Sequence, residues 1–219
     1  MIGTGDLAVD DLACRRGDRP VFAGVSFHLQ PGGALLLTGS NGSGKSSLLR
    51  VLATLLPAER GAIRWRGAPI ADDLPGYRAA LHYLGHLDAL KPALTPRDTL
   101  RFWAALRGVA ATDVAGALAG FALEPLADVP CRWLSAGQRR RVALARLAAA
   151  PAPLWLLDEP AAPLDRAGEA ELAAAVAAHR RHGGIAIVAT HAPLDLPDAA
   201  TLTLDDFAAA ALPDWAEAL

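Results

Sequence analysis

Residues 39–46 read GSNGSGKS, and they directly follow the short apolar run ALLLT at residues 34–38. The spacing matches the pattern G-x-x-x-x-G-K-[ST], a loop whose backbone N–H groups wrap around phosphates. Glycine suits these positions because the backbone must approach the phosphates with no Cβ in the way. A helix is expected to begin near Lys45, and its N-terminus would add N–H donors and a partial positive charge.

The pattern of this loop indicates which residues would bind a nucleotide such as ATP. We expect Lys45 to lie between the β- and γ-phosphates, and the Ser46 hydroxyl to ligate Mg²⁺. The alternative is a chance Gly/Ser turn, and the apolar strand before the loop and the apolar helix after it argue against that. The loop alone does not distinguish one class of P-loop protein from another. The expected contacts are Gly39, Ser40, Asn41, Gly42, Ser43, Gly44, Lys45, Ser46 and Ser47.

A second motif, LWLLDE at residues 154–159, places acidic residues at the end of a buried strand. Because ligands bind at the carboxyl ends of the strands in parallel sheets, we expect Asp158 and Glu159 beside the phosphate-binding loop. Asp158 can hold Mg²⁺ directly or through water, and Glu159 can orient and deprotonate an attacking water. Taken alone, the motif could equally be a strand end capped by solvated acids.

The rest of the chain alternates strand and helix patterns, which predicts an α/β fold with a mainly parallel sheet covered on both faces. The predicted strands are 21–29, 34–38, 61–65, 82–85, 154–157 and 185–190. The predicted helices are 45–56, 97–107, 113–123, 136–150 and 166–181. Strand signals are few between Asp88 and Ala150, so this stretch is predicted to be a helical insertion.

A third motif, LSAGQ at residues 134–138, precedes one of the predicted helices. Ser135 is a good N-cap, and together with the first backbone amides of the helix it would form a second anion site. One chain rarely needs two phosphate cradles for one nucleotide, so a facing copy of the chain is expected to supply the second. The basic run Arg139–Arg141 is expected to form a solvated or phosphate-facing side of this helix rather than a nucleic-acid surface.

The order of these motifs resembles the ATP-binding subunits of ABC transporters over nearly the whole chain. LSAGQ shortly before a DE strand is highly specific, since P-loop kinases and GTPases lack it. The resemblance implies a P-loop NTPase fold of the ABC type with an N-terminal antiparallel β subdomain. The chain would form a single domain, with residues 88–150 as its helical subdomain and residues 1–87 and 151–219 as its core.

The same resemblance implies that two copies close head to tail around two ATP molecules, as a homodimer of nucleotide-binding domains. Ser135, Gly137 and Gln138 would contact the γ-phosphate of the ATP that is held by the partner's Lys45. Ala136 replaces the commoner glycine of this motif, which is a mild departure.

Further roles follow from the resemblance for residues near the end of the chain. It makes Asp165 the aspartate at the seam between the two copies. It makes His191, after the strand 185–190, the histidine that reaches the γ-phosphate. Glu159, His191 and Lys45 are therefore the expected catalytic residues.

Two positions depart from the general ABC pattern. The family usually has a glutamine that senses Mg²⁺ and the membrane partner, and here the nearest match is His86, which can still donate or accept a hydrogen bond. We expect His86 to contact the nucleotide and Mg²⁺. The residue that stacks on adenine is open between Arg16 and Phe22, and Arg16 is favoured because a guanidinium can stack on a base as a planar cation.

Several strings resemble more narrowly the haem-exporter ATP-binding subunits of cytochrome c maturation, the CcmA family. They are HYLGHLDALK at 82–91, residues 134–146 and APLWLLDEP at 152–160, and Cys14 and His86 also fit. The resemblance implies a peripheral subunit on the cytoplasmic face of the bacterial inner membrane, with integral membrane partners of the CcmB and CcmC type. ATP hydrolysis would be linked to haem export or to release of a haem-loaded chaperone.

Composition limits other functions. With 21 Lys+Arg against 23 Asp+Glu and a net charge of -2, the chain has no long-range field for nucleic acid. Cys14 and Cys131 form neither a zinc spacing nor a haem-attachment motif, so no direct haem binding is expected. The N-terminus does not resemble a signal peptide, and no apolar run reaches the roughly 20 residues of a membrane span. Any link to a membrane is therefore expected to go through a partner.

Three alternatives remain beside this interpretation. The chain could serve another ABC exporter, or it could be a soluble ABC ATPase that acts on ribosomes or DNA. Those soluble proteins usually carry paired nucleotide domains or long insertions, which this sequence lacks. It could also be a module that binds ATP without turnover, and the presence of Glu159 and His191 argues against that.

Overall fold

The computed structural model of the chain describes residues 5–108, 113–191 and 194–208. A parallel sheet forms its centre, with the strand order β6-β7-β8-β3-β9, and this confirms the predicted α/β fold. Its strands are β3 (Ala34–Thr38), β6 (Leu81–Leu84), β7 (Leu154–Asp158), β8 (Ile185–Ala189) and β9 (Ala200–Thr203).

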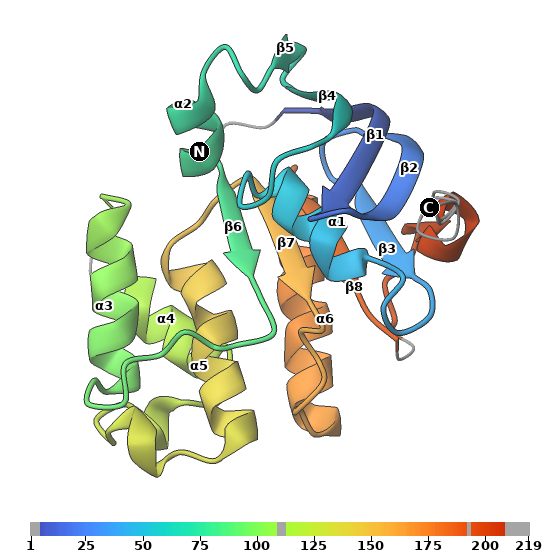
Figure 1. Cartoon of the computed structure of the whole chain (residues 1–219). Helices are drawn as coiled ribbons and strands as arrows, with labels where there is room; N and C mark the ends of the chain where they lie inside the picture. Colours follow the sequence, from blue (N-terminus) through green and yellow to red (C-terminus); the bar gives the residue numbers. More distant parts are fainter. Residues whose placement is uncertain (1–4, 109–112, 192–193, 209–219) are drawn as a thin grey trace.

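A second, antiparallel sheet lies at the upper right of Figure 1 and has the strand order β2-β1-β4-β5. This confirms the expected N-terminal antiparallel part of the fold. Strand β1, which the hydrophobic pattern did not predict, pairs with both β2 and β4. The strands are β1 (Leu7–Arg16), β2 (Arg19–Leu29), β4 (Arg60–Trp65) and β5 (Ala68–Pro69).

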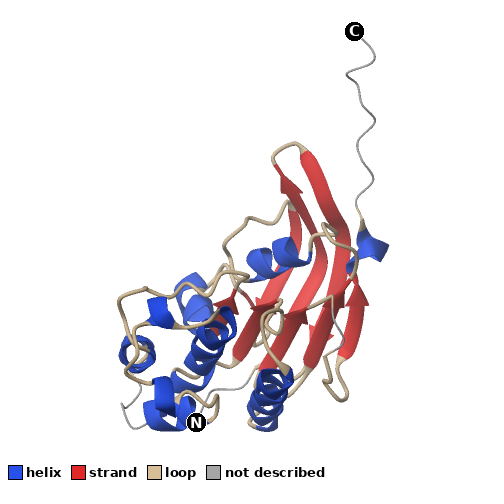
Figure 2. Cartoon of the chain, turned by 90° about the horizontal axis from the view of Figure 1, so that it is seen from below, coloured by secondary structure: helices blue, strands red, loops and turns tan. Residues whose placement is uncertain are grey.

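Helices cover both faces of the parallel sheet because side chains alternate along its strands. Leu154 and Leu156 of β7 belong to the core that also contains helix α1 (Lys45–Leu52) and the antiparallel sheet. Trp155 and Leu157 point to the other core, which is shared with the helical segment and helix α6 (Arg166–Arg181). Figure 2 shows most of the helices gathered to one side of the strands.

The helical segment follows β6 and lies at the lower left of Figure 1. Its elements are α3 (Pro96–Leu106), α4 (Asp113–Ala119), η1 (Glu124–Leu126), η2 (Cys131–Trp133) and α5 (Ala136–Ala149). Side-chain caps begin α3 and α5, where Thr95 and Ser135 accept hydrogen bonds from backbone N–H groups. Within the part of the chain that the structure describes, no helix is both long and apolar enough to cross a lipid bilayer.

Some predicted boundaries were wrong. Helix α1 ends at Leu52 rather than near residue 56, because Thr54 takes a left-handed φ of 59° that no helix can continue. The short helix α2 (Leu74–Ala79), strand β9 and the final turn η3 (Leu204–Phe207) were not predicted. The last two matter for function, because they bring an acidic side chain to the carboxyl edge of the parallel sheet.

Candidate functional site: a phosphate-binding cleft and a second polar pocket

The GSNGSGKS loop joins the end of β3 to the start of α1, as predicted. Gly44 precedes the helix with a φ of 103°, a conformation that favours glycine. A Cβ at this position would lie 2.5 Å from Val21 Cγ1 of strand β2. The close approach of the antiparallel sheet therefore makes glycine necessary at the helix entrance.

Lys45 is held inside this loop. Its Nζ donates hydrogen bonds to the carbonyls of Gly39 at 2.7 Å and Ser40 at 2.9 Å, and the residue is only 8% exposed. The loop thus surrounds a single ammonium with its own backbone. Such an arrangement suits recognition of a compact polyanion.

Asp158 and Ser46 meet at the carboxyl edge of the sheet, as predicted. The Ser46 hydroxyl donates to Asp158 Oδ1 at 3.0 Å, and Asp158 is 2% exposed. Asp158 Oδ2 is buried and has no hydrogen-bond partner among the described residues. A carboxylate oxygen and a hydroxyl are ligands that hard divalent cations prefer. In the described part of the chain no three His, Cys, Asp or Glu side chains group to hold a metal, so a cation here would take its remaining ligands from water or a bound nucleotide.

Glu159 and His191 form a second pair of side chains at the carboxyl edge of the sheet, after strands β7 and β8. His191 Nδ1 lies 2.9 Å from Glu159 Oε2, and their side chains are 59% and 19% exposed. Glu159 has a left-handed φ of 47°, which is uncommon outside glycine and is typical of functional turns. Its backbone N–H donates to the carbonyl of Ala189 at 2.9 Å, so the turn is fixed to strand β8. The paired carboxylate and imidazole can accept and orient a proton donor such as water.

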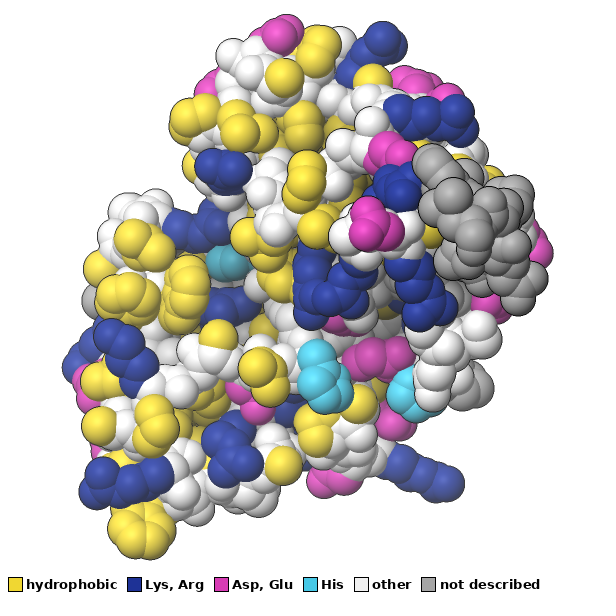
Figure 3. Space-filling model, viewed as in Figure 1, with side chains coloured by type: hydrophobic (Ala, Val, Ile, Leu, Met, Phe, Trp, Pro, Cys, Tyr) yellow, Lys and Arg dark blue, Asp and Glu magenta, His cyan; other side chains and the backbone are white. Residues whose placement is uncertain are grey.

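A cleft of about 1100 Å³ lies between the phosphate-binding loop and the turn between β1 and β2 of the antiparallel sheet; Glu159 lines it, whereas His191 lines a neighbouring pocket with Gly39. Arg16 lines the cleft, together with Lys45, Ser46 and Glu159. Phe22 is completely buried and packs in the core, so the structure removes it as a candidate for stacking on a base. Figure 3 shows basic side chains gathered on this face, next to acidic and histidine side chains. The lining residues are Arg15, Arg16, Gly17, Arg19, Pro20, Val21, Asn41, Gly42, Gly44, Lys45, Ser46, Ser47, Leu56, Pro57 and Glu159.

The LSAGQ motif forms a second, smaller pocket of about 340 Å³ that shares no lining residue with the cleft. Ser135 Oγ accepts from the Gln138 N–H at 3.2 Å, while Gln138 Oε1 accepts from the Ser135 N–H at 2.9 Å. This reciprocal capping confirms Ser135 as the N-cap of α5. A Cβ on Gly137 would lie 3.0 Å from the carbonyl of Pro163, so the motif packs closely against the segment before α6.

Asp165 lines the same small pocket and caps helix α6. Its Oδ1 accepts hydrogen bonds from the Gly168 N–H at 2.9 Å and from Arg141 Nη2 at 2.7 Å. These two bonds, first that of Gly168, lower the pKa of Asp165 below its usual range. The sequence-predicted residues Ser135, Gly137, Gln138 and Asp165 are therefore brought together, away from the cleft.

His86 lies on the exposed loop after β6 and does not line the cleft. It follows by two positions Leu84, which pairs with Leu157 of β7. The loop therefore leaves the sheet at the same edge as Asp158. The expected contact of His86 with nucleotide and Mg²⁺ stays a prediction.

Asp205 is a site residue that the sequence patterns did not identify. It lies in η3, and its carboxylate accepts hydrogen bonds from the Ser40 N–H at 2.8 Å and the Ser40 hydroxyl at 2.7 Å. These bonds lower the pKa of Asp205. The sequence signal that could have identified Asp205 is the same as for Asp158: an acidic residue that follows a strand and so lies at the carboxyl edge of the sheet.

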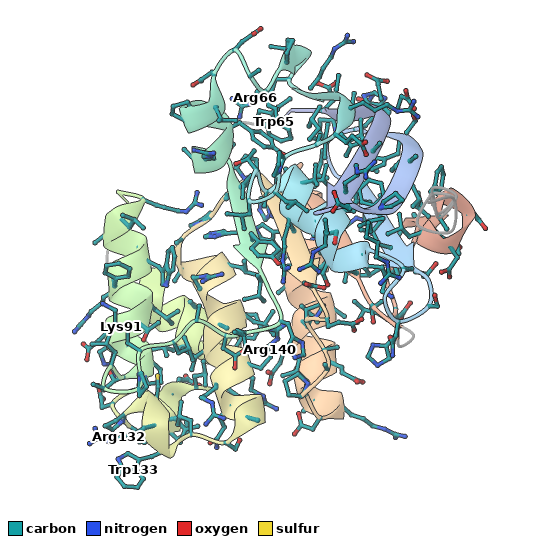
Figure 4. The ribbon with its side chains drawn as sticks, viewed as in Figure 1. Trp65, Arg66, Lys91, Arg132, Trp133 and Arg140 are labelled. Atoms are coloured by element: carbon teal, nitrogen blue, oxygen red, sulfur yellow. The ribbon has the colours of Figure 1, made fainter. Side chains whose placement is uncertain are left out.

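Arg140 corrects the prediction for the basic run 139–141. We expected a solvated or phosphate-facing helix side, but Arg140 is only 2% exposed. Figure 4 shows it in the interior, beside helix α5. Buried carbonyl acceptors, which no local pattern of charges reveals, account for this position.

Known proteins are similar to this chain in sequence and in fold. Residues 22–162 match the family model described as ABC transporter. The cytochrome c biogenesis ATP-binding export protein CcmA of Rhodospirillum rubrum is 56% identical over 92% of this chain and 86% of its own length. The protein of the same name from Paramagnetospirillum magneticum is 52% identical over 91% of this chain and 94% of its own length.

Solved structures agree with this relationship. A structure of an ATP-binding subunit of an ABC transporter superposes with a TM-score of 0.77 and 27% identity, over 84% of this chain and 79% of that one. An ABC transporter ATP-binding protein from Pyrococcus furiosus has the same fold, with a TM-score of 0.82, 24% identity and coverage of 93% and 100%. With its phosphate-binding loop, acidic strand end and LSAGQ helix, the chain belongs to the CcmA family of ABC transporter ATP-binding proteins, and it is an ABC-type ATPase.

Proposed function

We propose that this ATPase is the energy-supplying subunit of a cytochrome c biogenesis exporter, in which ATP hydrolysis drives haem export or the release of a haem-loaded chaperone. The main structural support for ATP hydrolysis is the Glu159–His191 pair, whose side chains lie 2.9 Å apart beside the phosphate-binding loop. The similarity to CcmA proteins at 43–56% identity supports the exporter. ABC ATPase subunits act together with membrane subunits, and for this chain we propose partners of the CcmB and CcmC type at the cytoplasmic face of the inner membrane.

The chemistry follows from the groups in the cleft. Backbone N–H groups of the loop and the Lys45 ammonium bind the phosphates of ATP and stabilise the charge that develops on the γ-phosphoryl group. Glu159 orients a water for in-line attack on the γ-phosphorus and accepts its proton, as ADP leaves. His191, 2.9 Å from the Glu159 carboxylate, orients that carboxylate and reaches toward the γ-phosphate.

Mg²⁺ is the cation that we propose for the oxygen ligands of this site. Ser46 Oγ and Asp158 would hold it, and the unpartnered, buried Asp158 Oδ2 supports the fit. When bound, the ion would neutralise charge on the β- and γ-phosphates. Arg16, which lines the cleft, is our proposed contact for adenine, and its planar guanidinium suits stacking on a base.

The second pocket supports a shared site. Helix α5 is 14 residues long, and the N–H groups of its first turn can donate to a phosphate. The pocket at this end of the helix is lined by Ser135, Gly137 and Gln138. That pocket lies apart from the loop of its own chain, so we propose that it completes the ATP site of a partner copy in a head-to-tail homodimer. Asp165 would lie at the seam between the copies, and residues 88–150 would be the helical subdomain that presents the motif.

Complementation tests the proposal. In a bacterium that lacks its own CcmA, this chain is expected to restore c-type cytochromes, measured by haem staining of separated membrane proteins. Glu159→Gln and Lys45→Ala are expected to fail while accumulating to the same level. Full restoration by Glu159→Gln would contradict the role of hydrolysis, and no restoration by the wild-type chain would contradict the exporter.

A further inference from the structure

The guanidinium of Arg140 is fully hydrogen-bonded inside the protein. Arginine has five N–H donors. Nε donates one bond, and Nη1 and Nη2 donate two each, so all five donors are used. The acceptors are four backbone carbonyls and one carboxylate: Pro160 O at 3.0 Å, Gly85 O at 3.0 Å, Asp88 Oδ1 at 3.2 Å, Asp158 O at 2.9 Å and Glu159 O at 2.8 Å.

Three of these carbonyls belong to consecutive residues of one turn, 158–160. The middle residue, Glu159, has the left-handed φ of 47°. Its N–H is fixed to Ala189 at 2.9 Å, and its carbonyl is fixed to Arg140 at 2.8 Å. The uncommon backbone conformation is therefore held from both sides, and the direction of the Glu159 side chain depends on it.

The other two acceptors lie on the loop that follows β6. Gly85 supplies a carbonyl, and Asp88 supplies a carboxylate that balances the buried positive charge. Arg140 itself lies on α5, two positions after Gln138 of the LSAGQ motif. One side chain thus connects helix α5, the loop 85–88 and the turn that carries Glu159 (Figure 4).

We propose that Arg140 is a positioning residue for ATP hydrolysis, which orients the Glu159 carboxylate and makes its direction depend on the placement of α5 and of the loop 85–88. The inference rests on the proposed role of Glu159 as the base. Lysine could not replace Arg140, because one ammonium has three donors at a single point and cannot serve five acceptors spread over the loop 85–88 and the turn 158–160.

A purely structural role is the competing explanation, and the chain offers a matched control for it. Arg146 lies on the same helix, is 6% exposed, and donates to the Tyr83 carbonyl at 3.0 Å while stacking over Trp103. Among the residues that the structure describes, neither a hydrogen bond nor an ion pair joins Arg146 to residues 158–160. If buried arginines of α5 act only in folding, substitutions at Arg140 and Arg146 should affect the protein alike.

Single-turnover hydrolysis of labelled ATP at excess enzyme separates the two explanations, with ATP affinity and thermal midpoint measured on the same samples. We expect Arg140→Met and Arg140→Lys to lower the hydrolysis rate by about 10- to 100-fold, the scale on which small displacements of catalytic groups act. ATP affinity should stay within about threefold, because Arg140 touches no residue of the phosphate-binding loop. Arg146→Met should lower the thermal midpoint but keep the rate of the folded protein within about threefold.

The same substitution in the Glu159→Gln background gives the decisive comparison. If Arg140 acts through the carboxylate, Arg140→Met should change the residual rate of Glu159→Gln by less than about twofold. An equal fold-loss in both backgrounds, or an Arg140→Met rate as high as that of Arg146→Met, would overturn the inference. Wild-type turnover by Glu159→Gln would instead overturn the proposed function, and the inference with it.

Asp88→Asn provides a second variant in case Arg140→Met does not fold. It keeps an oxygen acceptor for Nη1 but removes the balancing charge. We expect a loss of hydrolysis rate of about threefold to tenfold with ATP affinity unchanged, which corresponds to weakening one charged hydrogen bond. An unchanged rate would contradict the proposed dependence on the loop 85–88.

Discussion

The Ser46 hydroxyl donates a hydrogen bond to Asp158 Oδ1 at 3.0 Å, while Asp158 Oδ2 is buried with no hydrogen-bond partner in the described part of the chain. The two residues are 112 positions apart in the sequence. The parallel sheet places them together, because the end of β7 lies beside the start of α1. A buried carboxylate oxygen without a partner is costly, and a divalent cation would remove that cost.

Asp158→Asn is expected to raise the Mg²⁺ concentration needed for half-maximal ATP hydrolysis by at least about tenfold, because an amide oxygen is a weaker ligand than a carboxylate. A Mg²⁺ titration of the hydrolysis rate measures this. Asp128→Asn is the control, since that exposed aspartate pairs with Arg97 in the helical segment. Equal Mg²⁺ midpoints for Asp158→Asn and Asp128→Asn would contradict the assignment.

Lys45→Ala is expected to weaken ATP binding by about 10- to 100-fold, because one charge-assisted contact to the phosphates is lost. Equilibrium binding of a fluorescent ATP analogue measures it. The chain has one other lysine, Lys91, which lies over the ring of Phe102 at 5.9 Å. Lys91→Ala should therefore bind like the wild type, and undiminished binding by Lys45→Ala would refute the phosphate-binding role of the loop.

Two buried histidines are expected to make the fold sensitive to acid. Burial, followed by the charge of Arg107, lowers the pKa of His82 to about 3, and burial lowers the pKa of His179 to about 4. The imidazole of His179 also stacks on Trp155, with ring centres 3.9 Å apart. Both histidines are thus neutral in the folded protein under conditions where unfolded histidine is charged.

The sign of the effect follows from linkage. A histidine in the unfolded chain has a pKa near 6.5, so below that pH the unfolded chain binds protons that the folded protein does not bind. The free energy of unfolding therefore has its full value above about pH 6.5 and falls as the pH drops toward 4. We expect a loss of about 1.4 kcal/mol per pH unit for each histidine. Urea unfolding between pH 7.5 and 5 measures this slope. His179→Gln should reduce the slope, and an equal slope in the wild type and in His179→Gln would be inconsistent with the lowered pKa of His179.

Strong local signals predicted much of the fold and of the cleft. Helix α6 has the predicted bounds, because Asp165 caps its start and the apolar positions repeat with helical spacing. Strand β1 was missed, because Asp10 and Asp11 and the register shifts near Leu12 interrupt the alternation of apolar and polar residues. Local pattern therefore predicts regular elements better than irregular ones.

Arg140 illustrates what the sequence could not predict about the site. Its neighbours in the chain are Arg139 and Arg141, and a run of three arginines is ordinarily solvated. Its burial depends on acceptors from residues 85–88 and 158–160, which only the tertiary fold brings to helix α5. Asp205 was missed because strand β9, which precedes it, was not predicted, and because its partner Ser40 is 165 positions away.

We propose that two copies of this chain share two ATP molecules, each lying between the loop of one copy and the LSAGQ helix of the other. The direct test is the molar mass of purified Glu159→Gln at saturating Mg-ATP, measured by light scattering after size exclusion. We predict twice the 22.7 kDa of one chain with ATP, one chain mass without it, and loss of the dimer when Ser135→Arg is added. A mass of one chain for Glu159→Gln at saturating Mg-ATP would show that the two copies do not share ATP.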